Sequence, residues 1–382
     1  MPPFIHLRLH SEFSITDSIV RIDEAVAKAV GEHMPAMAIT DLSNLFGAVK
    51  FFQAMRGRGV QPIIGCEVWI ENEKNRDTPS RVLLLCRSQA GYLNLCQLLT
   101  RGFRENTWRG RAEIKRSWLD PNSTTGLIAL SGAASGDIGQ AILQDDLLRA
   151  NQLAQTWARD FPGAFYLELQ RVDGDNRRER DDLLVAATLR LAAKCDLPVV
   201  ATHPIQFMNA DDFKAHEARV CISRGEVLGD KRRSHEFTAD QYFKSSADMV
   251  ALFADIPEAI ENAIEIAKRC HFEFTLGKPK LPNFPIPEGV AIETYFREEA
   301  TAGLEKRLTK LYPDTAKRDQ ARALCRTPGV RSQNHRENGL PGLLLDRSRF
   351  HQLGAQPRRA GRAGSWFGRG FAGRIFARHH RS

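Results

Sequence analysis

The sequence lacks the closely spaced cysteine pairs of zinc ribbons and small disulfide-bonded domains. Its 382 residues include seven cysteines, an odd number, and no CxxC pair. No run of about eighteen apolar residues is present, and the opening MPPFIHLRLH has no basic stretch followed by an apolar core. We therefore expect reduced thiols, a cytoplasmic location and no membrane span.

The body of the chain also lacks positive charge, although the whole chain carries +8. From Ala323 to Ser382 there are 12 Arg, no Lys, one Glu and one Asp, so this tail carries +10 and residues 1–322 carry the remaining −2. The body as a whole therefore gives no electrostatic argument for a nucleic-acid groove.

Short apolar runs alternate with helical patterns, which predicts an α/β sheet or barrel. An open doubly wound sheet is the competing layout, but no GxGxxG follows the first strand. The expected strands are Phe4–Leu9, Met37–Thr40, Pro62–Ile70, Val82–Cys86, Gly126–Leu130, Phe165–Leu169 and Pro198–Thr202. The expected helices are Ile22–His33, Gly47–Arg56, one from Gly91, those after Asp137 and Arg177, Asp211–Ser223, Pro257–Arg269 and Glu293–Leu311.

A proline-rich stretch, Lys278–Pro287, predicts a domain boundary. We expect one domain over residues 1–275, a linker and helix over 276–322, and a tail over 323–382 whose lack of any helix or strand period predicts disorder.

Polar residues gather where the expected strands end, and strand ends carry the chemistry of α/β barrels. Such blocks are Arg8-Leu9-His10, Thr40-Asp41-Leu42, Gly65-Cys66-Glu67, Ser131-Gly132-Ala133 and Thr202-His203-Pro204-Ile205-Gln206. Arg8 and His10 share a face because alternate strand residues point the same way.

These blocks resemble the polymerase-and-histidinol-phosphatase (PHP) domain that opens bacterial DNA polymerase III alpha subunits. The resemblance covers residue 1 to about 322 and includes AITDLSNLFGAVKFF, QPIIGCEVWI, GYLNLCQLLTRGF, LPVVATH, DFKAHEARVCI and LFADIPEAIENAIEIAKRC. It implies an α/β fold, a PHP-type distorted (β/α) barrel, followed by the helical start of the polymerase region.

The resemblance also implies a metal-ligand pattern: His-x-His, Asp-His, Gly-x-Glu, a later His, a Cys and Asp-x-His. Such ligands would hold divalent metals that activate water against a phosphodiester. Ligands remain here at only three matching positions, His10, Asp41 and Glu67. The other positions carry Arg8, Leu42, Arg81, Ala133, Pro204 and Gln206. Leu and Ala cannot coordinate and Arg does not deprotonate, so we expect no metal and no hydrolysis.

Several polar residues have a plain structural interpretation. His10 and Glu67 are expected to pair with Arg8 or Arg81, and His203 to be a satisfied buried residue. His216 and Glu217 diverge by about 100° on a helix, which favours capping or packing over acid–base work. The stretch Lys231-Arg232-Arg233 is expected to be solvated, with a phosphate contact as the alternative.

The tail can be explained by a shifted reading frame. Codons for Ala363–Arg381, read one nucleotide later, can encode PGRGSGAGSLVAYSLGIT, which resembles the family's Gly-rich palm motif. The same shift lets Glu337–Leu340 encode KMGF and Asp346–Leu353 supply IVRDFINW. We therefore hypothesise a frameshift between about Arg318 and Pro328; an RG-rich RNA-binding segment is the alternative.

The resemblance implies a parent protein that synthesises DNA with paired aspartates and Mg²⁺. As written, this chain lacks the Gly-rich segment and those aspartates, so we expect it to be inactive alone and to need no cofactor. The implied role is a scaffold for the proofreading (epsilon-type) exonuclease subunit within the polymerase III holoenzyme; a stand-alone PHP phosphoesterase is the alternative.

Overall fold

The computed structural model describes residues 4–174, 177–230, 232–233, 236–278 and 284–324. It divides into two compact units, Met1–Thr275 and the part from Leu276 onward, each described here by itself. No helix in these described ranges is long and apolar enough to cross a membrane.

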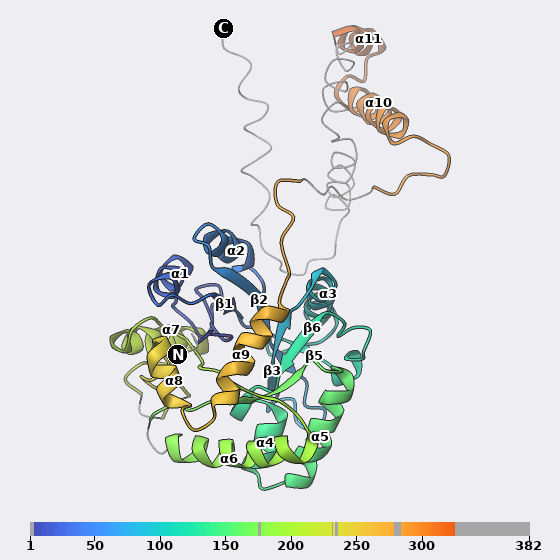
Figure 1. The fold of residues 1–382 in the computed structure, drawn as a ribbon. Coiled ribbons are helices and arrows are strands. Elements are labelled where there is room, and N and C mark those ends of the chain that lie inside the picture. Colours follow the sequence, from blue (N-terminus) through green and yellow to red (C-terminus); the bar gives the residue numbers. More distant parts are fainter. Residues whose placement is uncertain (1–3, 175–176, 231, 234–235, 279–283, 325–382) are drawn as a thin grey trace. The chain divides into compact units, whose positions relative to one another are not determined.

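The first unit is built around a single curved sheet (Figure 1). The strands lie in the order β4-β5-β2-β3-β6-β7-β8. β1 also pairs with β2, along residues 61–64, whereas β5 pairs with residues 69–70 of β2. β1–β2, β6–β7 and β7–β8 are parallel pairs, whereas β3 is antiparallel to both β2 and β6. The main strands are β1 (Ala36–Ile39), β2 (Gln61–Ile70), β3 (Ser80–Cys86), β6 (Leu127–Leu130), β7 (Phe165–Leu169) and β8 (Val199–Ala201).

The amino-terminal segment closes this sheet into a barrel. On one side Ala38 N donates to His6 O (2.8 Å) and Thr40 N to Leu9 O (2.8 Å); on the other, His10 N donates to Ile205 O (3.1 Å). The segment expected as a strand, Phe4–Leu9, is extended but forms only one bridge, between Leu9 and Ile205. Its backbone hydrogen bonds are divided between two neighbouring segments, so neither side has the consecutive bonds that define a strand. The expected α/β barrel is confirmed.

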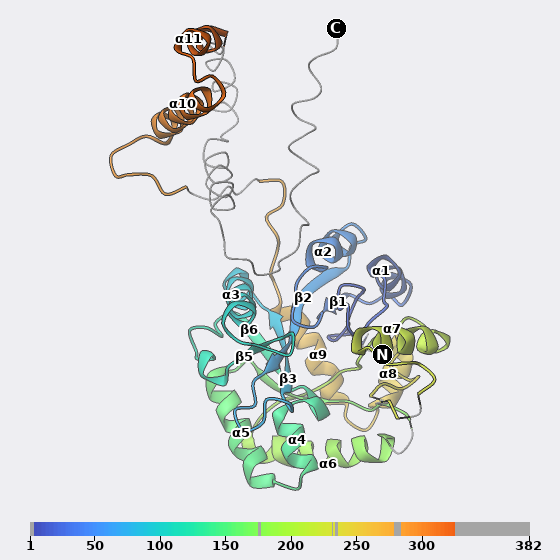
Figure 2. The same ribbon diagram turned by 180° about the vertical axis from the view of Figure 1, so that it is seen from behind.

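Helices cover the outside of the barrel. Figure 2 shows α4, α5 and α6 along the side away from α1 and α2. The helices of this unit are α1 (Ile22–Gly31), α2 (Ala48–Arg56), α3 (Gln89–Glu105), α4 (Asp137–Leu143), α5 (Leu147–Asp160), α6 (Arg177–Cys195), α7 (Phe213–Arg224), α8 (Ser246–Leu252) and α9 (Pro257–Arg269). They bury apolar residues at helical spacing: α9 begins with a proline, whose missing N–H is harmless there, and packs Ala259, Ala263 and Ile266 toward the core and β8.

The sequence patterns missed a short hairpin, β4 (Thr107–Trp108) with β5 (Arg111–Ile114), which extends the sheet beside β2. These strands are too short and too rich in arginine to show an apolar alternation. α8 was missed as well.

The second unit contains α10 (Ile292–Leu311) and α11 (Thr315–Leu324). The tail expected over 323–382 lies outside the described residues, apart from the two that end α11.

Candidate functional site

The buried polar site lies inside the barrel, where β1, β2 and β7 end. The extended amino-terminal segment contributes Arg8 and His10, β2 contributes Glu67, and β7 contributes Glu168. These side chains are almost fully buried, with residue exposures between 0% and 4%. Buried charges at such density require partners.

Arg8 lies between two glutamates. Its Nη1 donates to Glu67 Oε1 (2.5 Å), its Nε to Glu168 Oε1 (2.9 Å) and its Nη2 to Glu168 Oε2 (3.3 Å). Burial opposes the charge of Arg8, but Glu168 and Glu67 outweigh burial and raise the pKa of the guanidinium. Burial likewise works against ionised Glu67, yet Arg8 and Arg81 hold the pKa of that carboxyl well below its usual value. Both groups are therefore charged at neutral pH.

Glu168, which the sequence reasoning missed, is fixed by several donors. Gly132 N (3.0 Å), Gln170 Nε2 (2.8 Å) and the Thr202 hydroxyl all donate to its carboxylate. An acidic residue inside a fully buried strand, Phe165–Leu169, was the available signal.

His10 bridges two carboxylates. Its Nδ1 lies 3.1 Å from Asp17 Oδ1 and its Nε2 lies 2.9 Å from Glu67 Oε2. Burial alone would lower the pKa of His10, but Asp17 and Glu67 raise it to about 9. The ring is thus an imidazolium at neutral pH, and a metal would have to displace its proton in order to bind. Asp17 was also missed, because it matches no position of the ligand pattern.

Asp41 stands apart from the arginines. Its carboxylate accepts hydrogen bonds from Ser11 N (2.5 Å) and Ser11 Oγ (2.9 Å). Burial raises the pKa of Asp41 to about 6, although the Ser11 bonds oppose the shift.

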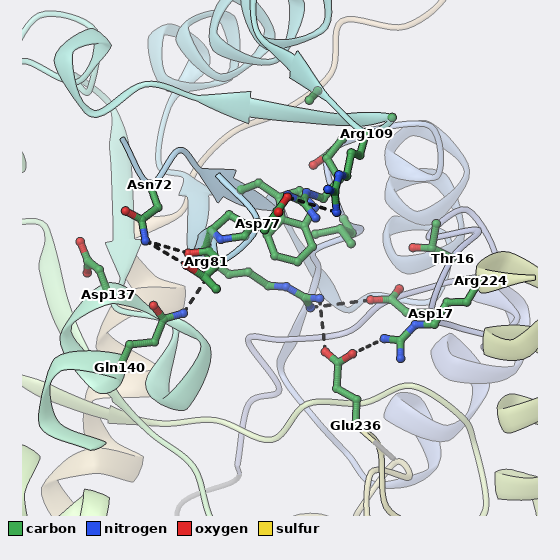
Figure 3. Close-up of a pocket in the computed structure, with 18 of the residues that line it drawn as sticks. Thr16, Asp17, Asn72, Asp77, Arg81, Arg109, Asp137, Gln140, Arg224 and Glu236 are labelled. Carbon is green, nitrogen blue, oxygen red and sulfur yellow. Dashed lines mark hydrogen bonds and ion pairs between the residues drawn. The ribbon is translucent and has the colours of Figure 1, made fainter. Parts of the chain in front are cut away.

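Arg81 closes the site on its outer side. Its Nη1 lies 3.5 Å from Glu67 Oε2, its Nη2 lies 3.6 Å from Glu236 Oε1, and its guanidinium lies 4.1 Å above the ring of Trp69. Figure 3 shows Arg81 between Asp17 and Glu236. Glu67 pairs with Arg8 and Arg81, as expected. His10, for which the same pairing was expected, lies against carboxylates instead.

Of the remaining pattern positions, Leu42, Ala133 and Pro204 have no side-chain ligand atom, and Gln206 has only a neutral amide oxygen. Leu42 pairs with Glu67 through a backbone bridge, and Ala133 and Pro204 are buried. Gln206 Nε2 lies 3.4 Å from His10 Nδ1. Within the described residues, no three or more His, Cys, Asp or Glu side chains are grouped to hold a metal. With two guanidinium groups among the carboxylates, these residues do not fit the family's metal cluster.

Other singled-out residues serve the framework. His203 Nε2 bonds Asp240 O (2.9 Å), and His216 Nε2 bonds Asp17 O (2.8 Å), which anchors the loop that carries Asp17. Glu217 pairs with Arg233 at 2.5 Å. Of the Lys231–Arg233 stretch, Lys231 lies outside the described residues, and exposed Arg232 pairs with Asp230 at 3.1 Å.

Comparison with known proteins identifies the barrel. Residues 6–172 match the family model of the PHP domain. This part of the barrel, residues 6–172, is a PHP domain. The chain is 46% identical over 318 residues to DNA polymerase III subunit alpha of Neisseria meningitidis serogroup A, covering 83% of this chain and 28% of that protein. It is 37% identical over 317 residues to DNA polymerase III subunit alpha of Escherichia coli K12, covering 83% and 27%.

Among solved structures, an amidohydrolase from Chromobacterium violaceum aligns at a TM-score of 0.38 and 13% identity, over 56% of this chain and 96% of that one. Nothing further rests on that likeness. The chain spans little more than a quarter of the length of the two polymerase subunits.

A cavity of about 900 Å³ opens above the buried site of the PHP domain. Its lining includes Asp17, Arg81, Arg109 and Glu236, which Figure 3 labels. Phe103 lines the same cavity. The PHP domain thus has a cavity at its strand ends, but the floor of that cavity is filled by paired charges.

Proposed function

We propose that this chain is part of a replicative DNA polymerase III alpha subunit, and that its PHP domain is a non-hydrolytic scaffold. The sequence identity of 46% and 37% to alpha subunits supports the first half. The second half depends on one observation: Arg8 lies between Glu67 and Glu168, at the point where the family pattern would place a metal ligand.

The charges of the buried site support a structural role. Arg8, Arg81 and His10 provide three cations, and Asp17, Glu67 and Glu168 provide three anions. A divalent metal entering this set would have to displace guanidinium groups that already satisfy the carboxylates. Hydrolysis needs the opposite arrangement, a metal with an open position for water.

The scaffold would hold the proofreading exonuclease subunit. The relatives are polymerase III subunits, which supports a place in that holoenzyme. The exonuclease subunit is the partner that the family resemblance implies. The test is coelution of the full chain with the exonuclease subunit of the same organism in size-exclusion chromatography. Separate elution at micromolar concentrations of both proteins would contradict the scaffold role.

The alternative is a stand-alone PHP phosphoesterase, and metal analysis separates the two functions. We expect purified chain to contain no stoichiometric zinc or manganese and to leave bis(p-nitrophenyl) phosphate intact with either ion added. Two or more tightly bound ions per chain, with hydrolysis, would establish the phosphoesterase instead.

We further propose that the tail is translated from a shifted frame and that the polymerase aspartates and their Mg²⁺ belong to the original frame. Primer extension by this chain alone should be undetectable. Incorporation of nucleotides that a Mg²⁺ chelator abolishes would refute this proposal.

A further inference from the structure

Every tryptophan in the described part of the chain lies against an arginine guanidinium. The guanidinium-to-ring distances are 4.1 and 5.4 Å for Arg81 and Arg111 on Trp69, 4.9 and 5.9 Å for Arg76 and Arg109 on Trp108, 4.1 Å for Arg101 on Trp118, and 3.4 Å for Arg116 on Trp157. All six arginines fall between residues 76 and 116. Arginine and aromatic side chains are therefore concentrated on one stretch of the barrel.

This stretch is locally positive. Residues 71–116 contain ten Lys and Arg but five Asp and Glu, a net charge of +5, although residues 1–322 together carry −2. The net charge of the body thus conceals a basic region that includes the β4–β5 hairpin.

The hairpin carries one arginine out to the mouth of the cavity. Arg109 and Gly110 form the turn with φ of 47° and 81°, a conformation in which Asn and Gly are the usual residues. Arg109 is nonetheless present, and its side chain is 67% exposed. Its only described acidic partner is Asp77, at 3.2 Å.

Neighbouring groups complete an outer wall of the cavity. Phe103 is 52% exposed. It lines the same cavity as Arg109, Arg111 and Arg149. Glu113 (3.1 Å) and Arg76 O (2.9 Å) fix the Arg111 guanidinium. We call Phe103, Arg109, Arg111 and Arg149 the hairpin wall.

We propose that the hairpin wall binds single-stranded nucleic acid without hydrolysing it. This inference rests on the proposed function, since a polymerase subunit works beside unpaired template. A base stacks on Phe103 or on an oriented guanidinium plane, and Arg109 and Arg149 meet phosphates. Asp17 and Glu236 are already paired with Arg81, so the phosphates are assigned to the wall arginines and not to the floor of the cavity.

An acidic peptide is the competing ligand class. Its carboxylates could pair with the arginines, but they would not stack on an exposed aromatic ring as a base does. Phe103 therefore favours the nucleic acid.

The test is fluorescence anisotropy of a labelled oligothymidylate of about twelve nucleotides with the full chain. The arginine-rich tail contributes equally to every variant, so differences between variants report on the wall. Phe103→Ala should weaken binding about tenfold. Arg109→Asn removes the charge and suits the positive φ, so it should weaken binding severalfold and reduce the salt dependence, with folding unaffected. Asp77→Asn frees Arg109 and should tighten binding.

Arg58→Ala is the matched control, because Arg58 is exposed on a different element, just after α2. The inference fails if Phe103→Ala and Arg109→Asn behave like this control, or if oligoglutamate of matched charge displaces the oligonucleotide equally well. Photocrosslinks from 5-iodouracil should map to Phe103 or Trp108; crosslinks confined to the tail would also overturn it.

These failures differ from failure of the proposed function. A chain that lacks metal and binds the exonuclease, yet shows no effect of the wall variants, refutes only the hairpin wall. Metal-dependent cleavage of the oligonucleotide refutes the non-hydrolytic scaffold.

Discussion

Replacing Arg8 with alanine would leave two buried carboxylates without their shared cation. The side chain makes three hydrogen bonds to Glu67 and Glu168, at 2.5, 2.9 and 3.3 Å. Removing one partner of a buried ion pair typically costs about 3–5 kcal/mol. Against a total stability of roughly 5–15 kcal/mol, Arg8→Ala should therefore destabilise the PHP domain severely.

Protonation limits this cost and makes it depend on pH. A glutamate that has lost its cation can take up a proton. The ordinary pKa of a glutamate is 4.5, so protonating it costs about 3.4 kcal/mol at pH 7 and only about 0.7 kcal/mol at pH 5. The electrostatic part of the loss should thus shrink by most of its size between these two pH values.

Urea unfolding followed by far-UV circular dichroism, at both pH values, measures the difference in unfolding free energy between wild type and Arg8→Ala. Arg58→Ala, at an exposed site, should change stability by less than about 0.5 kcal/mol. Adding Glu168→Gln to Arg8→Ala should recover part of the loss at pH 7. An Arg8→Ala loss that is the same at both pH values would show that packing, not the stranded charge, determines it.

The neighbouring groups give further predictions. The pKa of His10 is raised from 6.5 to about 9. Its charge therefore stabilises the fold fully below pH 6.5 and loses that effect as the pH rises toward 9. Between these pH values the unfolding free energy of the wild type should fall by an amount on the order of 3 kcal/mol, and His10→Gln should remove most of that fall in urea unfolding. Burial raises the pKa of Asp41 from 3.8 to about 6, which disfavours the charged form above that pH, so Asp41→Asn should stabilise the protein by about 1 kcal/mol or more near pH 8 and have little effect near pH 4. Sequencing the genomic DNA after codon 322 should find an open shifted frame leading to paired aspartates, and stop codons there would refute the frameshift.

The sequence predicted the barrel well because its elements are long and periodic. The buried face of α9 and the apolar run of β2 can be recognised without any tertiary information. The hairpin β4–β5 could not, because strands of two and four residues carry no period and depend on pairing with β2.

The site was predicted only where the family pattern directed attention. Glu67 was expected to pair with Arg8 or Arg81 and contacts both. His10 was expected to do the same, but it lies between Asp17 and Glu67. Asp17 and Glu168 were missed because they come from a loop and a strand that the ligand pattern does not include. Barrel closure brings Glu168 to Arg8 across 160 positions of the sequence. Asp17 lies only seven positions from His10, and the fold of the intervening loop brings the two together.

The pairing also explains why a single substitution would not restore a metal site. Arg8→His would supply one imidazole but leave Glu168 without its guanidinium, and Arg81 would still hold Glu67 from the outer side. His10 would remain protonated so long as Asp17 and Glu67 flank it. Arg8, His10 and Arg81 all contact Glu67. Several of these residues would therefore have to be substituted together before a divalent ion became the better partner of the carboxylates. The proposed scaffold role is consistent with this arrangement, because paired side chains occupy the position that a metal would need.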